Sequence, residues 1–134
     1  MSTIIAAVRT GKKDVLISVY RDGRRVQISP EAWKERTGID LAEKGEVIRI
    51  QMEKLDHNAL AHFVILAVGK YLKPFLGSRK HKVIITTNNQ LVAGQINGEI
   101  GAKKLADWVE RTKPLAEFIN IKAMAPKRVL GAVT

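Results

Sequence analysis

Cysteine is absent from the 134 residues of the chain. Its absence excludes a disulfide framework and a thiolate metal site, and it fits a cytoplasmic location. No apolar run approaches the roughly 20 residues of a membrane-spanning helix. The first residues also lack the basic start and the long apolar stretch of a secretory signal peptide. We therefore expect a cytoplasmic protein with no membrane partner.

Motifs of the common catalytic sites are also missing. The chain has three histidines, and His57 and His62 do not have the spacing of the HExxH zinc motif. Residues 9–12, Arg-Thr-Gly-Lys, are too few to form a glycine-rich phosphate loop. Ser29 precedes a proline and an acid, which is the pattern of a helix cap rather than of a nucleophile. We expect no catalytic residue, no metal ion and no other cofactor.

Acidic residues are fewer than basic residues. The chain has 23 Lys and Arg against 13 Asp and Glu, a formal net charge of +10 and a pI near 10.1. A small domain this basic attracts polyanions, of which nucleic acid is the commonest. The alternative is a basic surface that only keeps the protein soluble. The length and the 46% hydrophobic content fit one folded domain over residues 1–134.

Three strands are expected at the start of the chain. Residues 3–9 are apolar, and residues 14–20 alternate between apolar and polar side chains. Residues 25–29 follow as a third strand, with Val26 and Ile28 expected to point inward. The Asp-Gly pair before this strand tolerates the positive φ of a type I′ turn, so the second and third strands should form a hairpin.

Two helices and a strand are expected next. Residues 29–38 begin with a capping serine and a proline and end at a glycine, which predicts a short helix. Residues 45–52 alternate as a strand does. Residues 57–72, after the capping Asp56, are apolar almost all round, which predicts a central helix covered on two sides. His62 on this helix fits a buried, hydrogen-bonded histidine better than a metal ligand.

The most specific pattern follows. Residues 83–87 are a β-branched run typical of a buried strand. Asn88 and Asn89 stop this strand and can cap a helix over residues 91–98, because their side-chain oxygens accept backbone N–H groups. The remaining expected elements are a helix at residues 103–111, a helical turn at 115–118 and a strand at 119–124.

Residues 87–99 read Thr-x-x-Gln-Leu-Val-x-x-Gln-Ile-Asn-Gly-Glu, and this pattern resembles the fourth strand and following helix of ribonuclease H-like domains. The resemblance extends from Thr3 to Arg128. It implies an α/β domain of ribonuclease H-like fold. Its mixed five-stranded sheet would have three antiparallel strands first, then parallel additions, with flanking helices. Residues 29–44 look like an insertion in that fold, and a role in dimerisation or in ligand contact is left open.

Enzymes of this family hydrolyse phosphodiesters with two magnesium ions held by carboxylates. The resemblance places the four acidic positions within residues 8–10, at His62, at Asn88, and in a last helix that this chain lacks. None of these positions carries a carboxylate. Hard divalent cations need anionic oxygen ligands, so the resemblance implies a domain that has lost catalysis.

The sequence therefore favours a non-catalytic nucleic-acid-binding protein, with single-stranded DNA as the favoured partner and RNA as a further candidate. A looser resemblance, in size, charge and lack of cysteine, is to single-stranded DNA-binding proteins of hyperthermophilic crenarchaea, which would make the chain archaeal. One alternative is a metal-dependent nuclease with relocated carboxylates, for which Asp22 and Glu31 are candidates. Another is an oligomeric structural protein, such as a homodimer that uses the inserted segment.

The expected nucleic-acid contacts are mostly cationic, because phosphate neutralisation dominates such binding. Trp33 or Tyr20 could add a platform for a base, although a core position is the favoured interpretation for Trp33. The candidate binding residues are Arg9, Lys12, Lys13, Arg21, Arg24, Arg25, Trp33, Arg79, Lys80, Lys82, Asn88, Lys127 and Arg128.

Overall fold

The structure, a computed structural model, describes residues 2–11, 14–39, 48–51, 56–77 and 79–124. No helix within these ranges is long and apolar enough to cross a membrane. The elements in chain order are β1 (Ser2–Thr10), β2 (Asp14–Arg21), β3 (Arg24–Val26), α1 (Pro30–Thr37), β4 (Ile48–Gln51), α2 (His57–Tyr71), η1 (Lys73–Phe75), β5 (His81–Thr87), α3 (Gln90–Ile96), α4 (Ala106–Thr112), η2 (Lys113–Glu117) and β6 (Asn120–Ala123).

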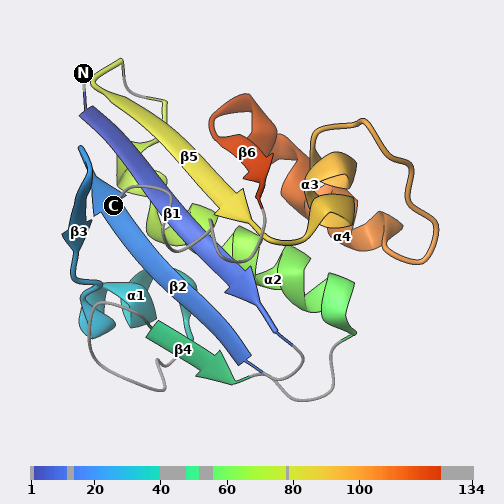
Figure 1. Cartoon of the computed structure of the whole chain (residues 1–134), viewed down its shortest axis with the longest axis horizontal. Helices are drawn as coiled ribbons and strands as arrows, with labels where there is room; N and C mark the ends of the chain where they lie inside the picture. Colours follow the sequence, from blue (N-terminus) through green and yellow to red (C-terminus); the bar gives the residue numbers. More distant parts are fainter. Residues whose placement is uncertain (1, 12–13, 40–47, 52–55, 78, 125–134) are drawn as a thin grey trace.

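One mixed sheet forms the centre of the fold, with the strand order β3-β2-β1-β5-β6 (Figure 1). The pairs β1–β2 and β2–β3 are antiparallel, whereas β1–β5 and β5–β6 are parallel. Parallel neighbours need a crossover connection. The helical segment between β4 and β5 brings the chain back to β1, and the segment from α3 to η2 connects β5 to β6. This order confirms the expected sheet of three antiparallel strands followed by parallel additions.

The outer edge of β2 carries two short strands. β3 pairs with residues 19–21 of β2, and β4 pairs with residues 14–17. Both are antiparallel to β2, so the chain leaves this edge after Val26, forms α1, and returns to the same edge at Ile48. The sheet therefore gains β4 as a further strand off the main path. The insertion at residues 29–44 stays a prediction. Part of this segment lies outside the described residues.

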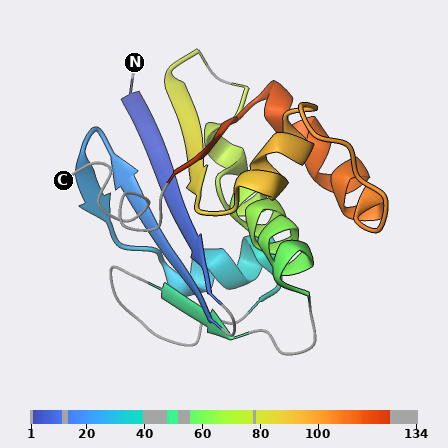
Figure 2. The ribbon, with the colours of Figure 1, turned by 45° about the vertical axis from the view of Figure 1, so that its right-hand side comes forward.

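The helices pack on one face of the sheet (Figure 2). The main core lies between the two layers and is built from β-branched and aliphatic residues of β1, β2 and β5 together with those of α2. Helix α2 contacts β1 on one side and α1, α3 and α4 on others. These contacts explain why α2 is apolar almost all round, and they confirm it as the central helix.

Several local signals act as the sequence predicts. Asp22 and Gly23 have φ of 52° and 81°, as the hairpin turn requires. The Ser29 side chain accepts the backbone N–H of Ala32, and Gly38 ends α1 in the left-handed region at φ 74°. In α3 the Asn89 side chain accepts the Val92 N–H at 3.0 Å. Side-chain capping and glycine conformational freedom therefore set these element ends.

Three local predictions were wrong. The third strand ends at Val26, which is 40% exposed at the sheet edge, whereas the buried Ile28 lies beyond the strand. Asp56 precedes α2, but its side chain makes no capping hydrogen bond. Helix α4 begins at Ala106 instead of Lys103, because the segment before it is an irregular turn.

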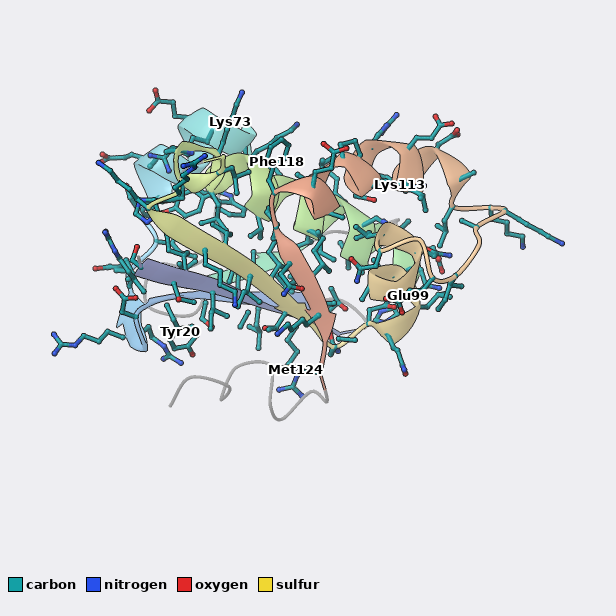
Figure 3. The ribbon with its side chains drawn as sticks, turned by 90° about the horizontal axis from the view of Figure 1, so that it is seen from above. Tyr20, Lys73, Glu99, Lys113, Phe118 and Met124 are labelled. Carbon is teal, nitrogen blue, oxygen red and sulfur yellow. The ribbon has the colours of Figure 1, made fainter. Side chains whose placement is uncertain are left out.

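The other face of the sheet carries a smaller cluster. Ala7 and Tyr20 are buried there, with Ile5 and Met124 packed against them. Figure 3 shows Tyr20 and Met124 on the side of the sheet away from the helices. Alternation along β1 and β5 sends Arg9 and Lys82 to this same face.

Candidate nucleic-acid interface

Thr10 and Asn88 join the carboxyl ends of β1 and β5. The Asn88 Oδ1 accepts from the Thr10 backbone N–H at 2.9 Å and from its hydroxyl at 3.1 Å. The Asn88 Nδ2 donates to the Thr10 carbonyl at 2.9 Å. The carboxamide thus bonds to β1 as a backbone amide would and extends the β1–β5 pairing past Thr87. These bonds give Asn88, a candidate binding residue, a role in the framework.

Neighbouring amides complete this end of the sheet. Asn89 caps α3 with its oxygen and donates its Nδ2 to the Asn58 Oδ1 at the start of α2, at 2.9 Å. Among the described residues, no group of three or more His, Cys, Asp or Glu side chains could hold a metal ion. Amides and hydroxyls alone provide little of the anionic charge that a magnesium pair requires.

His62 lies elsewhere in the helical layer. It is fully buried, with Nδ1 3.1 Å from the Thr112 hydroxyl and Nε2 2.9 Å from the Gln95 Oε1. Burial lowers the pKa of His62, and the hydrogen bond to Gln95 partly opposes this effect. The structure confirms a satisfied core histidine. Its partners lie in α3 and α4, so His62 does not join Thr10 and Asn88 as the aligned family position implied.

Six candidate cations meet at the opposite end of the sheet, where β1 and β5 begin and β2 ends. We call this group the basic rim: Arg21, Arg24, Arg25, Arg79, Lys80 and Lys82. Arg21 pairs with Ile4 and Lys82 with Thr3 of β1, so their backbones are two strand spacings apart, about 10 Å. Alternation places Arg21 and Arg24 on one face and Arg25 and Lys82 on the other, so positive charge surrounds the strand ends.

Like charges oppose each other directly within the basic rim. Arg21 and Arg24 are cross-strand partners in the β2–β3 hairpin, an arrangement that is destabilising by some tenths of a kcal/mol. The nearby Asp22 directs its Oδ1 to the Thr3 backbone N–H at 2.8 Å. A bound anion would relieve the repulsion between the two guanidinium groups.

Arg9 lies far from the basic rim. Because Arg21 pairs with Ile4, Arg9 is roughly 17 Å away along β1, at about 3.3 Å per residue. Arg9 is exposed and shares its face of the sheet with Lys122 of β6. The sequence interpretation missed Lys122, although its alternation with the buried Ile121 could have identified it. The candidate cations that the structure describes therefore do not form one continuous groove.

Both candidate aromatic platforms are buried, which for Trp33 is the core position that the sequence favoured. Trp33 is 0% exposed and Tyr20 is 1% exposed. Trp33 packs against the Tyr71 ring at 5.3 Å between α1 and α2. Arg25 donates to the Tyr20 hydroxyl at 2.9 Å and lies over its ring. Neither ring face can receive a base.

Four further candidates, Lys12, Lys13, Lys127 and Arg128, lie outside the described residues. The exposed Arg9, Arg21, Arg24, Arg79 and Lys82 stay candidates, as do Arg25 and Lys80 with their existing contacts.

No protein-family model matches the sequence, and no curated protein matches it in a sequence search. The structure is similar to the N-terminal ribonuclease H domain of a Mycobacterium tuberculosis protein, solved as a fusion with maltose-binding protein. That similarity has a TM-score of 0.66 and 12% identity over 98% of this chain and 88% of the other.

It is also similar to LC11 ribonuclease H1 in complex with an RNA/DNA hybrid. The TM-score is 0.51 and the identity 11%, over 96% of this chain and 88% of the other. At such identities the similarity extends to the fold alone. The chain therefore has a ribonuclease H-like fold.

Proposed function

We propose that this domain binds nucleic acid without cutting it, with single-stranded DNA as the preferred partner, through the basic rim. The observation that carries the proposal is the direct opposition of Arg21 and Arg24 on a hairpin that also carries Arg25. Cations that repel one another in the free protein are stabilised when a phosphate chain lies between them.

The choice of partner rests on charge and on the fold. The net charge of +10 favours a polyanion over a small neutral ligand. One protein of similar fold was solved with an RNA/DNA hybrid bound, which supports nucleic acid as the class of partner. Release of counterions from the phosphates would supply most of the affinity and make it strongly dependent on salt.

Binding without cleavage follows from the chemistry of the Thr10–Asn88 end. Two-metal hydrolysis needs carboxylates that hold both cations beside the scissile phosphate. Thr10, Asn58, Asn88 and Asn89 contribute amides and hydroxyls there, already hydrogen-bonded to one another, and the described residues include no group of three or more side chains that could hold a metal ion. A phosphodiester held among these four residues would therefore lack the carboxylate-bound metal ions that two-metal cleavage requires.

The test is fluorescence anisotropy with labelled single-stranded DNA, single-stranded RNA and duplex DNA between 50 and 200 mM salt, with and without magnesium. We expect single-stranded DNA to bind most tightly and to weaken by orders of magnitude across the series. The double variant Arg21→Glu/Arg24→Glu should lose at least about tenfold in affinity and bind with a shallower salt dependence.

The matched control is Lys103→Glu/Lys104→Glu, which changes the net charge equally at exposed positions before α4. It should retain affinity within about threefold, as long-range charge effects are screened at these salt concentrations. Equal losses in the two variants would refute the basic rim as the site. Absence of binding by the wild type would refute the function. Magnesium-dependent shortening of the labelled strand would identify a nuclease instead.

A further inference from the structure

The basic rim borders a pocket at the starts of β5 and β6. The pocket has a volume of about 520 Å³, within the range of about 300–1,000 Å³ typical of ligand sites. Lys82, a residue of the basic rim, is part of its lining, together with His81 beside it. The pocket is therefore continuous with the cationic surface that would hold a phosphate chain.

Phe118 supplies an exposed aromatic ring to this pocket. It is 55% exposed, more than any other large apolar side chain in the described part of the protein. Figure 3 shows Phe118 beside η2, on the helical side of the sheet. An exposed aromatic ring beside cations is the combination that binds unpaired bases in single-stranded nucleic acid sites.

The backbone around Phe118 is held firmly. The Phe118 N–H donates to the Leu115 carbonyl at 3.0 Å, and the Ile119 N–H donates to the same carbonyl at 2.8 Å. The next side chain, Ile119, is buried in the core. The ring is thus presented from an ordered turn, so little conformational entropy need be lost when a flat ligand stacks on it.

Polar groups around the ring match the edge of a base. Asn97 donates its Nδ2 to the Ile121 carbonyl at 2.8 Å, which leaves its Oδ1 as an acceptor. Asn120 adds an exposed carboxamide with both donor and acceptor atoms. Glu117, also in the lining, opposes a phosphate inside the pocket but can accept from an exocyclic amino group. The chemistry suits a base inside and a phosphate at Lys82.

We propose that this pocket receives one unpaired nucleobase, which stacks on Phe118 while Lys82 neutralises an adjoining phosphate. The proposal rests on the proposed function and explains why the domain would prefer single strands to duplex. Bases within a duplex are stacked on their neighbours and cannot enter, so the pocket selects single strands.

The test compares Phe118→Ala with the wild type in the same anisotropy assay. Stacking on an aromatic ring contributes about 1–3 kcal/mol per base, so the variant should bind single-stranded DNA about five- to 150-fold more weakly. Its salt dependence should match that of the wild type, because no phosphate contact is lost. The variant Phe118→Trp should retain affinity, and the added indole fluorescence should be quenched on binding.

Leu91→Ala is the control, because Leu91 is another exposed apolar residue, at 39%, on α3. It should bind as the wild type does. Thermal melting of each variant checks that the fold is intact. If Phe118→Ala binds as tightly as the wild type while Arg21→Glu/Arg24→Glu loses affinity, the base pocket is refuted and the basic rim stands. If the wild type binds no strand, both proposals fail.

Discussion

Asn88 and Thr10 are joined by three hydrogen bonds that use both polar atoms of the Asn88 carboxamide. A carboxylate could reproduce the two accepted bonds but not the one donated to the Thr10 carbonyl. Its charge would also be repelled by that carbonyl oxygen. The amide is therefore the better residue for fastening β1 to β5, whereas an acid would be the better metal ligand.

This relationship predicts that both Asn88→Ala and Asn88→Asp destabilise the protein by about 1–3 kcal/mol, since Ala leaves the Thr10 N–H and carbonyl unpaired and Asp leaves the carbonyl unpaired. Urea unfolding monitored by circular dichroism gives the free energies. Asn120→Ala, at an exposed position, should change stability by less than about 0.5 kcal/mol. An Asn88→Asp variant as stable as the wild type would contradict the strand-fastening role.

The buried His62 predicts a loss of stability in acid. Burial lowers its pKa below the usual value of 6.5, so the unfolded chain takes up the proton at higher pH than the folded protein does. Stability should therefore be constant above about pH 6.5 and fall as the pH drops below it, by at most about 1.4 kcal/mol per pH unit.

Two measurements check this pH dependence. Nuclear magnetic resonance of the imidazole should follow the titration of His62 directly, and urea unfolding across the pH range should give the slope. His62→Gln should flatten the slope, whereas His57→Gln, at an exposed position, should leave it unchanged. Identical slopes in all three proteins would show that His62 is not the group responsible.

Trp33 should matter for stability and not for binding. Its side chain is fully buried against Tyr71, so Trp33→Ala should destabilise the protein by about 3–5 kcal/mol. The Trp33 Nε1 is buried without a hydrogen-bond partner, so Trp33→Phe removes an unsatisfied donor and should destabilise it much less. Folded Trp33→Phe should bind DNA as the wild type does; a large loss of affinity would restore Trp33 as a contact residue.

Asp22 should be replaceable by asparagine and not by alanine. Its φ of 52° suits Asn and Asp, and its Oδ1 accepts from the Thr3 N–H at 2.8 Å. Asp22→Ala should therefore destabilise the protein by about 1–2 kcal/mol. Asp22→Asn should change stability by less than about 0.5 kcal/mol and, by removing a negative charge beside the basic rim, tighten DNA binding at low salt. Equal stability of the two variants would exclude the hydrogen bond as the cause.

Most element ends could be predicted because their determinants are local, whereas the strand order was expected from the resemblance of residues 87–99 to ribonuclease H-like domains. Ser29, Asn89 and the Asp22–Gly23 pair act on backbone groups within a few residues, and the β-branched run of β5 indicates burial on its own. These signals need no knowledge of the tertiary structure.

The composition of the site was harder to predict, since it depends on which side chains the fold leaves exposed. Trp33 has the residue type of a stacking platform, but α1 packs it onto α2. Phe118 occupies an ordinary apolar position in the sequence, and only the turn after η2 exposes it. Arg9 and Arg21 are the same residue type, and each lies near the end of its strand. They are distant in space because β1 and β2 run in opposite directions.

The hydrogen bond between Asp22 and Thr3 fastens the tip of the β2–β3 hairpin to the first strand before any ligand arrives. Guanidinium groups mounted on a pre-ordered backbone need no folding step at the moment of association. Calorimetry should accordingly detect only a small heat-capacity change on binding, unlike the large negative value that accompanies folding of a disordered basic segment around its partner.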